Sequence, residues 1–401
     1  MKHLKNTIIV LSLVLIGCIN IKAQVLTHED SVNLITLRND QNTQITGYGE
    51  AYYQRNLTDR TANADLARAV LFVGHKFTEK ISFVSELEVE DAKVSGGESG
   101  GEVAMEQAFI RFGLGKNSYI NVGLFLPRIG IMNENHLPTS YFGNERPVME
   151  TILIPSTWRE LGIGLYGEID HIQGLNYSIA LVNGLNASGF TPETGIREGR
   201  FEGRNASANT FAITGSLDYY LGNFKFQYSG YYGGSHADYT RVTDSLKLKS
   251  DVFSLPVFLN EADVSFDNNG WSFKAIGCII NISDAEKINY AFNNGVSKTM
   301  IGGYAELGYD IFSSFHYGKN LIVFARYENI DMNYSLPSNL VQNSSLQLNY
   351  ITTGISFLPT KGVVIKADYK NLVTGKPKLY PNSVNYYNNS NWINVGLGYS
   401  F

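Results

Sequence analysis

The stretch that decides the fold is the last one, Asn391–Phe401, which reads N-W-I-N-V-G-L-G-Y-S-F. Apolar side chains alternate along it with small or polar ones, so one face of an extended strand is apolar: Ile393, Val395, Leu397, Tyr399 and Phe401. A period of two indicates a half-buried β-strand. The pattern recurs along most of the chain, and beyond the N-terminal segment no stretch resembles a transmembrane helix. Repeated alternating strands indicate a membrane-spanning β-barrel, because a closed barrel leaves no backbone group unpaired in lipid.

The alternation predicts sixteen strands, at residues 44–53, 66–76, 81–91, 103–113, 119–127, 160–168, 175–183, 208–221, 224–234, 251–266, 271–282, 298–311, 320–331, 344–358, 363–372 and 391–401. Bacterial barrels have an even number of strands, which brings both chain ends to the periplasmic side. Short and long connections alternate along this chain, and every short one falls on the side of the termini. We therefore predict an all-β fold, a transmembrane antiparallel β-barrel of about 16 strands with long extracellular loops.

The N-terminal segment is typical of a secretion signal. Lys2 and Lys5 precede the apolar stretch Ile8–Ile19, and the bond after Ala23 is a plausible cleavage point. We expect a signal peptide (1–23), a short periplasmic leader (24–43) and an outer-membrane β-barrel (44–401). An alternative interpretation is a lipoprotein signal, in which Cys18 would be lipidated.

Composition and charge agree with a barrel and argue against other classes of protein. The chain is 44% hydrophobic, and its 25 Tyr and 22 Phe suit aromatic girdles at two membrane interfaces. Its formal net charge is −5, which becomes about −8 once the three lysines of the signal segment are removed. Nucleic-acid binding needs a basic surface, so we expect no nucleic-acid partner.

Strand parity sorts the charged side chains into the lumen. A charge facing lipid near the bilayer midplane costs about 2–4 kcal/mol, so charged residues are expected on the opposite face. The resulting lumen wall comprises Arg68, Glu86, Glu88, Arg111, Arg326, Glu328, Lys366 and Asp368. These residues either brace the wall as opposite-charge pairs, such as Arg326 with Glu328 and Lys366 with Asp368, or contact the passing solute.

The longest connection, Arg128–Arg159, is the main candidate for a constriction loop. Its many apolar residues, among them Ile129, Met132 and Ile154, need a surface to pack on. Folding into the barrel would supply that surface and narrow the pore. The alternative is an outer cap packed on other loops or on a neighbouring subunit. The polar residues expected at the pore constriction are Arg128, Glu134, His136, Glu145, Arg146 and Arg159.

A second long loop, Gly184–Ser207, carries arginines and glutamates in equal number. The arginines are Arg197, Arg200 and Arg204. They could form a basic vestibule that gathers anions, but the matching acids favour a solvated, charged loop.

Four short motifs resemble segments of the phosphate-selective porin O and P family, as found in Bacteroidetes-type bacteria. They are Pro155–Gly164 (P-S-T-W-R-E-L-G-I-G), Phe324–Glu328 (F-A-R-Y-E), Lys366–Tyr369 (K-A-D-Y) and Gly396–Phe401 (G-L-G-Y-S-F). The likeness spans most of the mature chain. It implies a sixteen-stranded, usually trimeric porin through which small hydrophilic solutes diffuse. The best-known members bind phosphate through rows of Arg and Lys.

The sequence thus predicts a porin in the outer membrane of a Gram-negative bacterium, forming a homotrimer and passing small hydrophilic solutes or ions. Anions such as phosphate are candidates, although the row Glu86, Glu88 and Glu90 opposes them. The alternative is a closed outer-membrane barrel with a structural or surface-binding role. None of the seven histidines has a metal-ligand spacing, and no phosphate-binding glycine loop is present, so we expect no enzyme, cofactor or metal.

Overall fold

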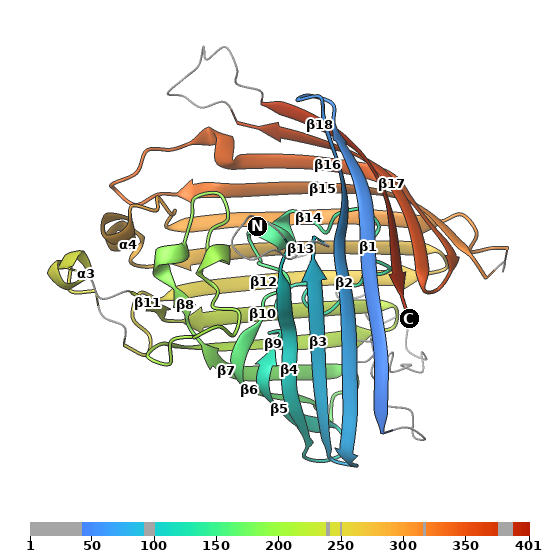
Figure 1. Cartoon of the computed structure of the whole chain (residues 1–401), viewed down its shortest axis with the longest axis horizontal. Coiled ribbons are helices and arrows are strands. Elements are labelled where there is room, and N and C mark those ends of the chain that lie inside the picture. Colours follow the sequence, from blue (N-terminus) through green and yellow to red (C-terminus); the bar gives the residue numbers. More distant parts are fainter. Residues whose placement is uncertain (1–41, 92–100, 238–240, 249–250, 316–317, 376–387) are drawn as a thin grey trace, which may run out of the picture.

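The computed structural model describes residues 42–91, 101–237, 241–248, 251–315, 318–375 and 388–401. Within them the chain forms a closed antiparallel barrel of sixteen strands (Figure 1). The expected signal peptide, the leader up to residue 41 and Cys18 lie outside the described residues. None of the described helices is long and apolar enough to cross a membrane.

The barrel strands follow one another in chain order, and β1 closes the barrel by pairing with β18. Their bounds are β1 Thr43–Asn56, β2 Thr61–Thr78, β3 Ile81–Glu90, β4 Val103–Gly113, β5 Ser118–Phe125, β6 Glu160–Glu168, β7 Leu175–Asn183, β9 Phe211–Leu221, β10 Phe224–Gly233, β12 Val257–Asn268, β13 Trp271–Ile282, β14 Thr299–Asp310, β15 Asn320–Ser335, β16 Gln347–Thr360, β17 Val363–Thr374 and β18 Asn389–Ser400.

The remaining elements lie in the long loops. Two short strands, β8 (Leu185–Asn186) and β11 (Ser235–His236), form a separate parallel pair. The helices are α2 (Met149–Ile152), α3 (Arg241–Ser245) and α4 (Ala285–Phe292), and the 3-10 turns are η2 (Ala187–Gly189), η3 (Arg197–Gly199) and η4 (Ser344–Leu346).

The sixteen predicted strands are all present, and those at β4, β6, β7 and β13 have the predicted bounds. The other twelve strands differ from the predicted bounds at one or both ends, most clearly at the first loop and at the start of β12. The first loop is only residues 57–60, because the β1–β2 pairing continues to Asn56 opposite Thr61 beyond the apolar part of both strands. β12 starts at Val257 rather than at residue 251, where a turn forms instead: Asp251 N donates to Ser254 Oγ at 2.8 Å.

Short turns connect the hairpins at the rim where β1 begins and β18 ends. Between β12 and β13, Asn269 and Gly270 have φ angles of 50° and 84°. A type I′ turn needs positive φ at both central residues, and Asn-Gly is the pair that adopts it most readily. This turn fixes the register between β12 and β13.

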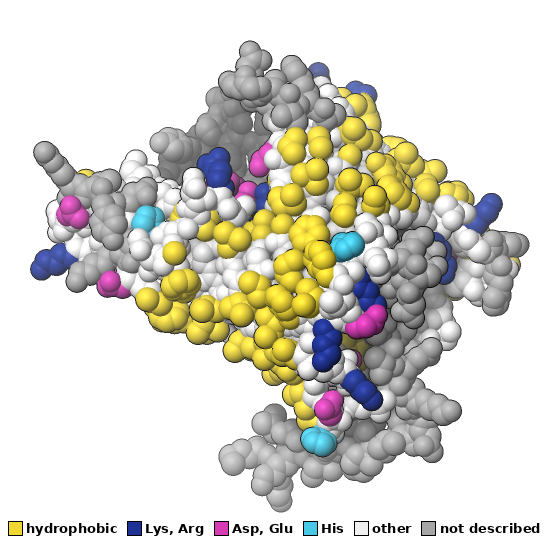
Figure 2. Space-filling view, turned by 60° about the horizontal axis from the view of Figure 1, so that its bottom comes forward, with side chains coloured by type: hydrophobic (Ala, Val, Ile, Leu, Met, Phe, Trp, Pro, Cys, Tyr) yellow, Lys and Arg dark blue, Asp and Glu magenta, His cyan; other side chains and the backbone are white. Residues whose placement is uncertain are grey.

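The outer wall of the barrel is apolar and the inner wall is charged, as parity predicts. On β15, Val323 and Tyr327 are 39% and 51% exposed and face outward, whereas Arg326 and Glu328 are 2% and 0% exposed and face the lumen. Figure 2 shows hydrophobic side chains gathered across the wall, with charged side chains mostly near its margins. Such an apolar outer band is the surface that a barrel presents to lipid.

Candidate functional site

The connection between β5 and β6, residues 126–159, folds into the barrel and is named here the luminal loop. Two wall strands bind its backbone through inward-facing carboxylates. Glu328 of β15 accepts a hydrogen bond from Met149 N at 2.9 Å, and Asp368 of β17 accepts one from Asn144 N at 2.6 Å. The predicted inward fold of this loop is therefore confirmed, and an outer cap is excluded.

Lysines of the wall hold the carbonyls of the same loop. Lys366 Nζ donates to Gly143 O at 2.8 Å and lies 3.6 Å from the ring centre of Tyr141. Within the described chain, no ion pair joins Lys366 to Asp368, so the prediction that these two residues pair was wrong. Each of them binds the luminal loop instead. Lys366 donates to Gly143 O at 2.8 Å, and Asp368 accepts from Asn144 N at 2.6 Å.

Arg326 forms the wall bridge that the sequence predicts. Its Nε lies 3.0 Å from Glu328 Oε1, and its Nη1 lies 3.1 Å from Glu306 Oε2. All three side chains are almost completely buried. Since Glu328 also holds Met149 N, the bridge orients a carboxylate that anchors the luminal loop. These wall charges thus act mainly on the loop.

The other side of the luminal loop packs on an apolar patch of the wall. Its fully buried residues include Ile129, Met132, Met149, Leu153, Ile154 and Trp158. They share one hydrophobic cluster with inward-facing residues of β12 to β15, namely Leu259, Ile276, Ile280, Met300, Tyr304 and Ile330. Each such burial contributes about 1.5–3 kcal/mol, so this packing fixes where the remaining space lies.

That space is a cavity of about 580 Å³, named here the outer cavity because long-loop residues line much of it. Its lining contains six basic side chains, Arg68, Arg146, Arg159, Arg197, Arg200 and Lys370, and six acidic ones, Glu50, Glu90, Glu102, Glu145, Glu198 and Glu202. The volume falls within the usual range of small-molecule sites, about 300–1,000 Å³. Polar side chains dominate this lining, so it suits a hydrophilic occupant.

Most of the basic side chains in the outer cavity are neutralised by neighbouring acids. Arg68 Nε lies 2.9 Å from Glu50 Oε1. Glu202 binds two arginines, Arg159 at 2.9 Å and Arg200 at 2.7 Å. Lys370 pairs with Glu145 in the same lining. These pairs are arranged so that little net charge remains around them.

Arg146 and Arg197 are the least neutralised cations of this cavity. Arg146 donates to His136 O at 3.3 Å, and within the described residues it has no carboxylate within 4.0 Å. Arg197 donates to two backbone carbonyls and lies 3.8 Å from Glu198, whose side chain is 57% exposed. Burial and the positive charge of Arg200 lower the pKa of Arg197 to about 10, which still leaves it charged at neutral pH.

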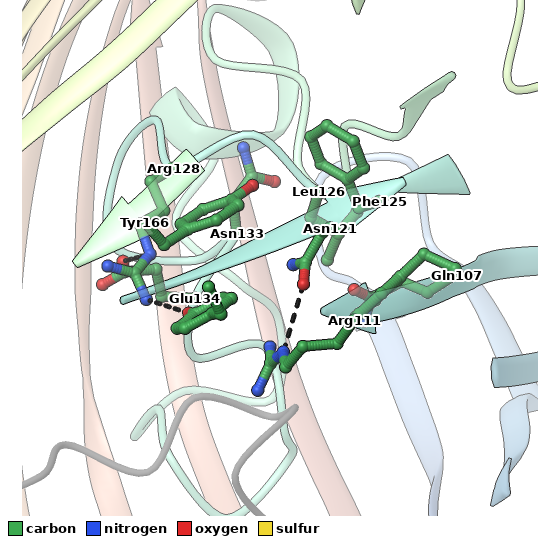
Figure 3. A pocket seen from close by; sticks show the side chains of 11 residues that line it. Gln107, Arg111, Asn121, Phe125, Leu126, Arg128, Asn133, Glu134 and Tyr166 are labelled. Atoms are coloured by element: carbon green, nitrogen blue, oxygen red, sulfur yellow. Dashed lines mark hydrogen bonds and ion pairs between the residues drawn. The ribbon is translucent and has the colours of Figure 1, made fainter. Parts of the chain in front are cut away.

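A smaller cavity of about 40 Å³ lies at β4, β5 and β6, and is named here the inner cavity (Figure 3). Four of its side chains form a stack. Arg111 Cζ lies 4.1 Å from the ring centre of Tyr119, whose ring stacks on Tyr166 at 5.1 Å, and Arg128 Cζ lies 5.2 Å from the Tyr166 ring. A space of this size holds water or a small ion, so it does not suit an organic solute.

The predicted constriction residues divide between the two cavities. Glu145, Arg146 and Arg159 line the outer cavity, and Arg128 and Glu134 line the inner one. Glu134 is largely buried there, between Arg128 at 3.2 Å and Lys225.

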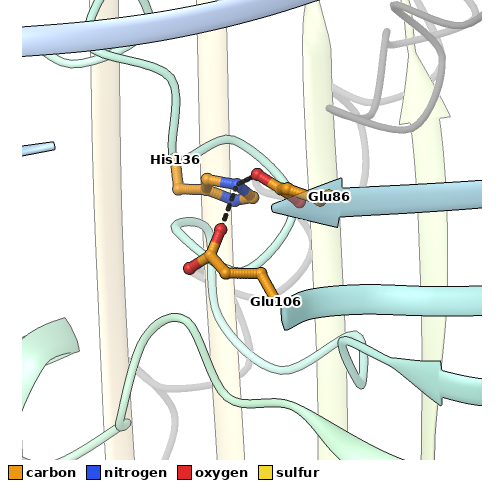
Figure 4. A group of neighbouring side chains, drawn as sticks. All are labelled: Glu86, Glu106 and His136. Atoms are coloured by element: carbon orange, nitrogen blue, oxygen red, sulfur yellow. Dashed lines mark hydrogen bonds and ion pairs between the residues drawn. The ribbon is translucent and has the colours of Figure 1, made fainter. Parts of the chain in front are cut away.

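His136 lines neither cavity. It is completely buried against Glu86 and Glu106, so it does not face an open passage (Figure 4). Glu88, expected in the lumen wall, bridges to Arg68 Nη1 at 3.1 Å.

Several residues of the site were missed by sequence reasoning. Glu106 and Gln107 are consecutive yet both buried inside the barrel, because a register shift between β3 and β4 places Glu86 opposite Gln107 and Leu87 opposite Met105. Strict alternation forbids two inward neighbours, and a β-bulge allows them.

The matching acids favour a solvated loop for Arg197 and Arg200, with a basic vestibule as the alternative. In the structure both arginines line the outer cavity and bind carbonyls of the luminal loop, including Thr151 O and Thr157 O.

Comparison with known proteins gives a sequence relative that covers most of the chain. The chain is 32% identical, over 338 residues, to an uncharacterised protein of Aquifex aeolicus (strain VF5), covering 81% of this chain and 74% of that protein. No family model matches the chain.

Solved structures of outer-membrane proteins share the fold. Salmonella typhi OmpF, in complex with daunomycin, is 12% identical with a TM-score of 0.56, over 90% of this chain and 97% of that one. An anion-selective porin from Comamonas acidovorans is 12% identical with a TM-score of 0.54, over 90% and 99%. The outer-membrane channel DcaP of Acinetobacter baumannii is 11% identical with a TM-score of 0.54, over 90% and 97%. At these identities the likeness shows the porin fold.

Proposed function

We propose that this chain, which belongs to the family of the Aquifex aeolicus protein, is an outer-membrane porin through which small hydrophilic solutes diffuse passively. The observation that carries the proposal is the luminal loop. It is anchored inside a closed barrel and leaves a charged cavity of about 580 Å³ beside it. Such channels select solutes by pore width and by the charges that line the narrow part.

Within this proposal the favoured solutes are small anions, with phosphate as the member of this class that the motif resemblance names. The lining of the outer cavity holds as many acids as cations, but four of its six cations are paired with acids, and Arg146 and Arg197 are left as the cations with the weakest carboxylate contacts. A guanidinium group binds oxyanions in a bidentate manner, which suits a phosphate-like solute. The porin of Comamonas acidovorans, described as anion-selective, has the same fold.

The proposal includes a homotrimer in the outer membrane of a Gram-negative bacterium, without enzymatic activity. A fold neighbour, OmpT of Vibrio cholerae, is described in a trimer form. Light scattering of the purified protein after chromatography in detergent would measure the number of chains per particle. A mass of one chain would contradict the trimer and leave the channel proposal intact.

Shortening the luminal loop tests the channel proposal. Met132 N donates to Glu150 Oε2 at 2.7 Å, so the two ends of a deletion of residues 133–148 lie close enough to be joined by a short Gly-Ser linker. We expect a higher single-channel conductance than that of the wild type, because the deleted segment occupies the lumen. A matched deletion of residues 338–342, a loop in which Val341 is 72% exposed, should leave the conductance unchanged.

The alternative function is a closed barrel with a structural or surface-binding role. It predicts that the wild type and both deletions conduct no current, although all three are folded and inserted. That result would overturn the proposed function.

A further inference from the structure

Four buried side chains meet between the two cavities, and three of them are drawn in Figure 4. Glu86 comes from β3, Glu106 from β4 and His136 from the luminal loop, and all three are 0% exposed. His136 Nε2 lies 3.3 Å from Glu86 Oε1 and 3.8 Å from Glu106 Oε2. The hydroxyl of Tyr48 donates hydrogen bonds to the same two oxygen atoms, at 3.0 Å and 3.3 Å. One nitrogen and three oxygens therefore surround a common centre.

These atoms have the spacing of ligands around a metal ion. In a tetrahedral zinc site with bonds of about 2.0–2.2 Å, neighbouring ligand atoms lie roughly 3.3–3.6 Å apart. The four separations of 3.0, 3.3, 3.3 and 3.8 Å lie around that range. Carboxylate oxygen and imidazole nitrogen are ligands for Zn²⁺ and similar divalent ions. We propose that Glu86, Glu106 and His136 bind one Zn²⁺-like divalent cation, with the Tyr48 hydroxyl at the fourth corner.

The second oxygen of each carboxylate supports this assignment independently. Gln107 Nε2 donates to Glu86 Oε2 at 2.8 Å, and Thr157 Oγ1 donates to Glu106 Oε1. The oxygens held by Gln107 and Thr157 point away from the centre, and the other oxygen of each carboxylate lies near His136 Nε2. Outer hydrogen bonds that orient ligating carboxylates in this way are a regular part of protein metal sites.

The charge balance of the cluster also calls for a cation. Two fully buried carboxylates face each other here, and burying an uncompensated carboxylate is costly. Arg159 reaches only to 4.0 Å of Glu106 Oε1, and in the described part of the chain no Lys or Arg lies within 4.0 Å of Glu86. A divalent ion at the centre neutralises both carboxylates. The competing arrangement shares protons among the same groups and binds no metal.

Each of the two carboxylates is hydrogen-bonded to a residue that lines a cavity. Gln107, which holds Glu86, lines the inner cavity, and Thr157, which holds Glu106, lines the outer one. Two ligands come from wall strands and one from the luminal loop, so a bound ion fastens the loop to the wall. This inference does not depend on whether the barrel conducts solutes.

Metal binding to the full-length mature barrel, folded in detergent and carrying no polyhistidine tag, tests the proposal. After treatment with a chelator and its removal, the protein is equilibrated with ZnCl₂, and bound zinc is measured by elemental analysis. We expect about one zinc per chain for the wild type and almost none for His136→Ala. His171→Ala alters an exposed histidine in the turn between β6 and β7, and should bind zinc as the wild type does.

Two further measurements distinguish loss of the metal site from misfolding of His136→Ala. Glu86→Gln keeps the shape of the side chain, and should weaken zinc binding at least about tenfold while the barrel keeps its heat-modifiable mobility on gels. Co²⁺ bound to the wild type should show the intense visible absorption of a four-coordinate ion. Wild-type protein without bound zinc, or equal binding by the wild type and a folded Glu86→Gln, would overturn the proposal.

Discussion

The carboxylate of Asp368 in β17 holds Asn144 of the luminal loop by two hydrogen bonds, from the backbone N–H at 2.6 Å and from Nδ2 at 2.8 Å. The two residues are 224 positions apart in the chain, and both are buried inside the barrel. A wall charge thus acts as an anchor for the segment that narrows the lumen. The same holds for Glu328, which binds Met149 N.

Asp368→Ala should loosen the luminal loop without opening the barrel. It leaves the Asn144 N–H buried without its acceptor, at a cost of about 1–3 kcal/mol. We expect faster proteolysis within residues 126–159 and noisier single-channel currents. Glu79→Ala, which removes a carboxylate with a 91% exposed side chain in a periplasmic turn, serves as the control. Equal cleavage of both variants and the wild type would contradict the anchoring role.

Much of the fold could be predicted from the sequence because a barrel wall follows a period of two over sixteen strands. The luminal positions of Arg326, Glu328, Lys366 and Asp368 follow from parity alone, since a charge on the lipid face is costly. The contacts of these side chains do not follow from parity. These contacts depend on the path of the irregular luminal loop, whose sequence has no regular alternation from which its path could be predicted.

The cluster around His136 could not be predicted for two physical reasons. Its members come from two strands and a loop that are distant in sequence, so no motif spacing joins them. In addition, Glu106 lies at a register shift, where alternation assigns it to the wrong face. Bulges of this kind are frequent near functional sites. The extra residue breaks the alternation of inward and outward side chains, so the alternation predicts the wrong face there.

Small residues on the inner face of the wall make room for the luminal loop. A Cβ added at Gly308 of β14 would lie 2.5 Å from a ring carbon of Phe142. Gly308→Leu should therefore displace this part of the loop and speed its proteolysis. Gly277→Leu is the matched control, because a Cβ at this outward-facing glycine of β13 meets nothing within 4 Å. Identical digestion patterns for the two variants would show that Phe142 does not pack as described.

Charge reversal in the outer cavity should change ion selectivity. Arg146→Glu removes a cation of the outer cavity, and the reversal potential in a KCl gradient should move toward cation preference. Arg204→Glu makes the same change at an exposed residue of the second long loop, and should have a much smaller effect. Equal shifts for the two variants would show that the outer cavity does not control selectivity.

The stability of the luminal loop should depend on pH through Glu150 in α2. Burial raises the pKa of Glu150 to about 7 from an ordinary value of 4.5. Between these two values the folded loop holds a proton that the released loop has lost, so loop stability falls as pH rises through this window. Below about pH 4.5 both states are protonated, and above about pH 7 the loss is complete.

Glu150→Gln tests this dependence. The variant stays neutral at every pH, so its loop should resist proteolysis equally between pH 5 and pH 8. The wild-type loop should become easier to cleave over the same range. A wild-type profile as flat as that of Glu150→Gln would contradict the assignment.

Single-channel recording of the purified wild-type barrel, in a planar bilayer under a KCl gradient, measures whether the luminal loop narrows an open diffusion channel. We expect discrete openings, a reversal potential that favours anions, and a current reduced by added phosphate. If a folded and inserted barrel shows no openings, the channel proposal is wrong and a closed barrel with a structural or surface-binding role is favoured.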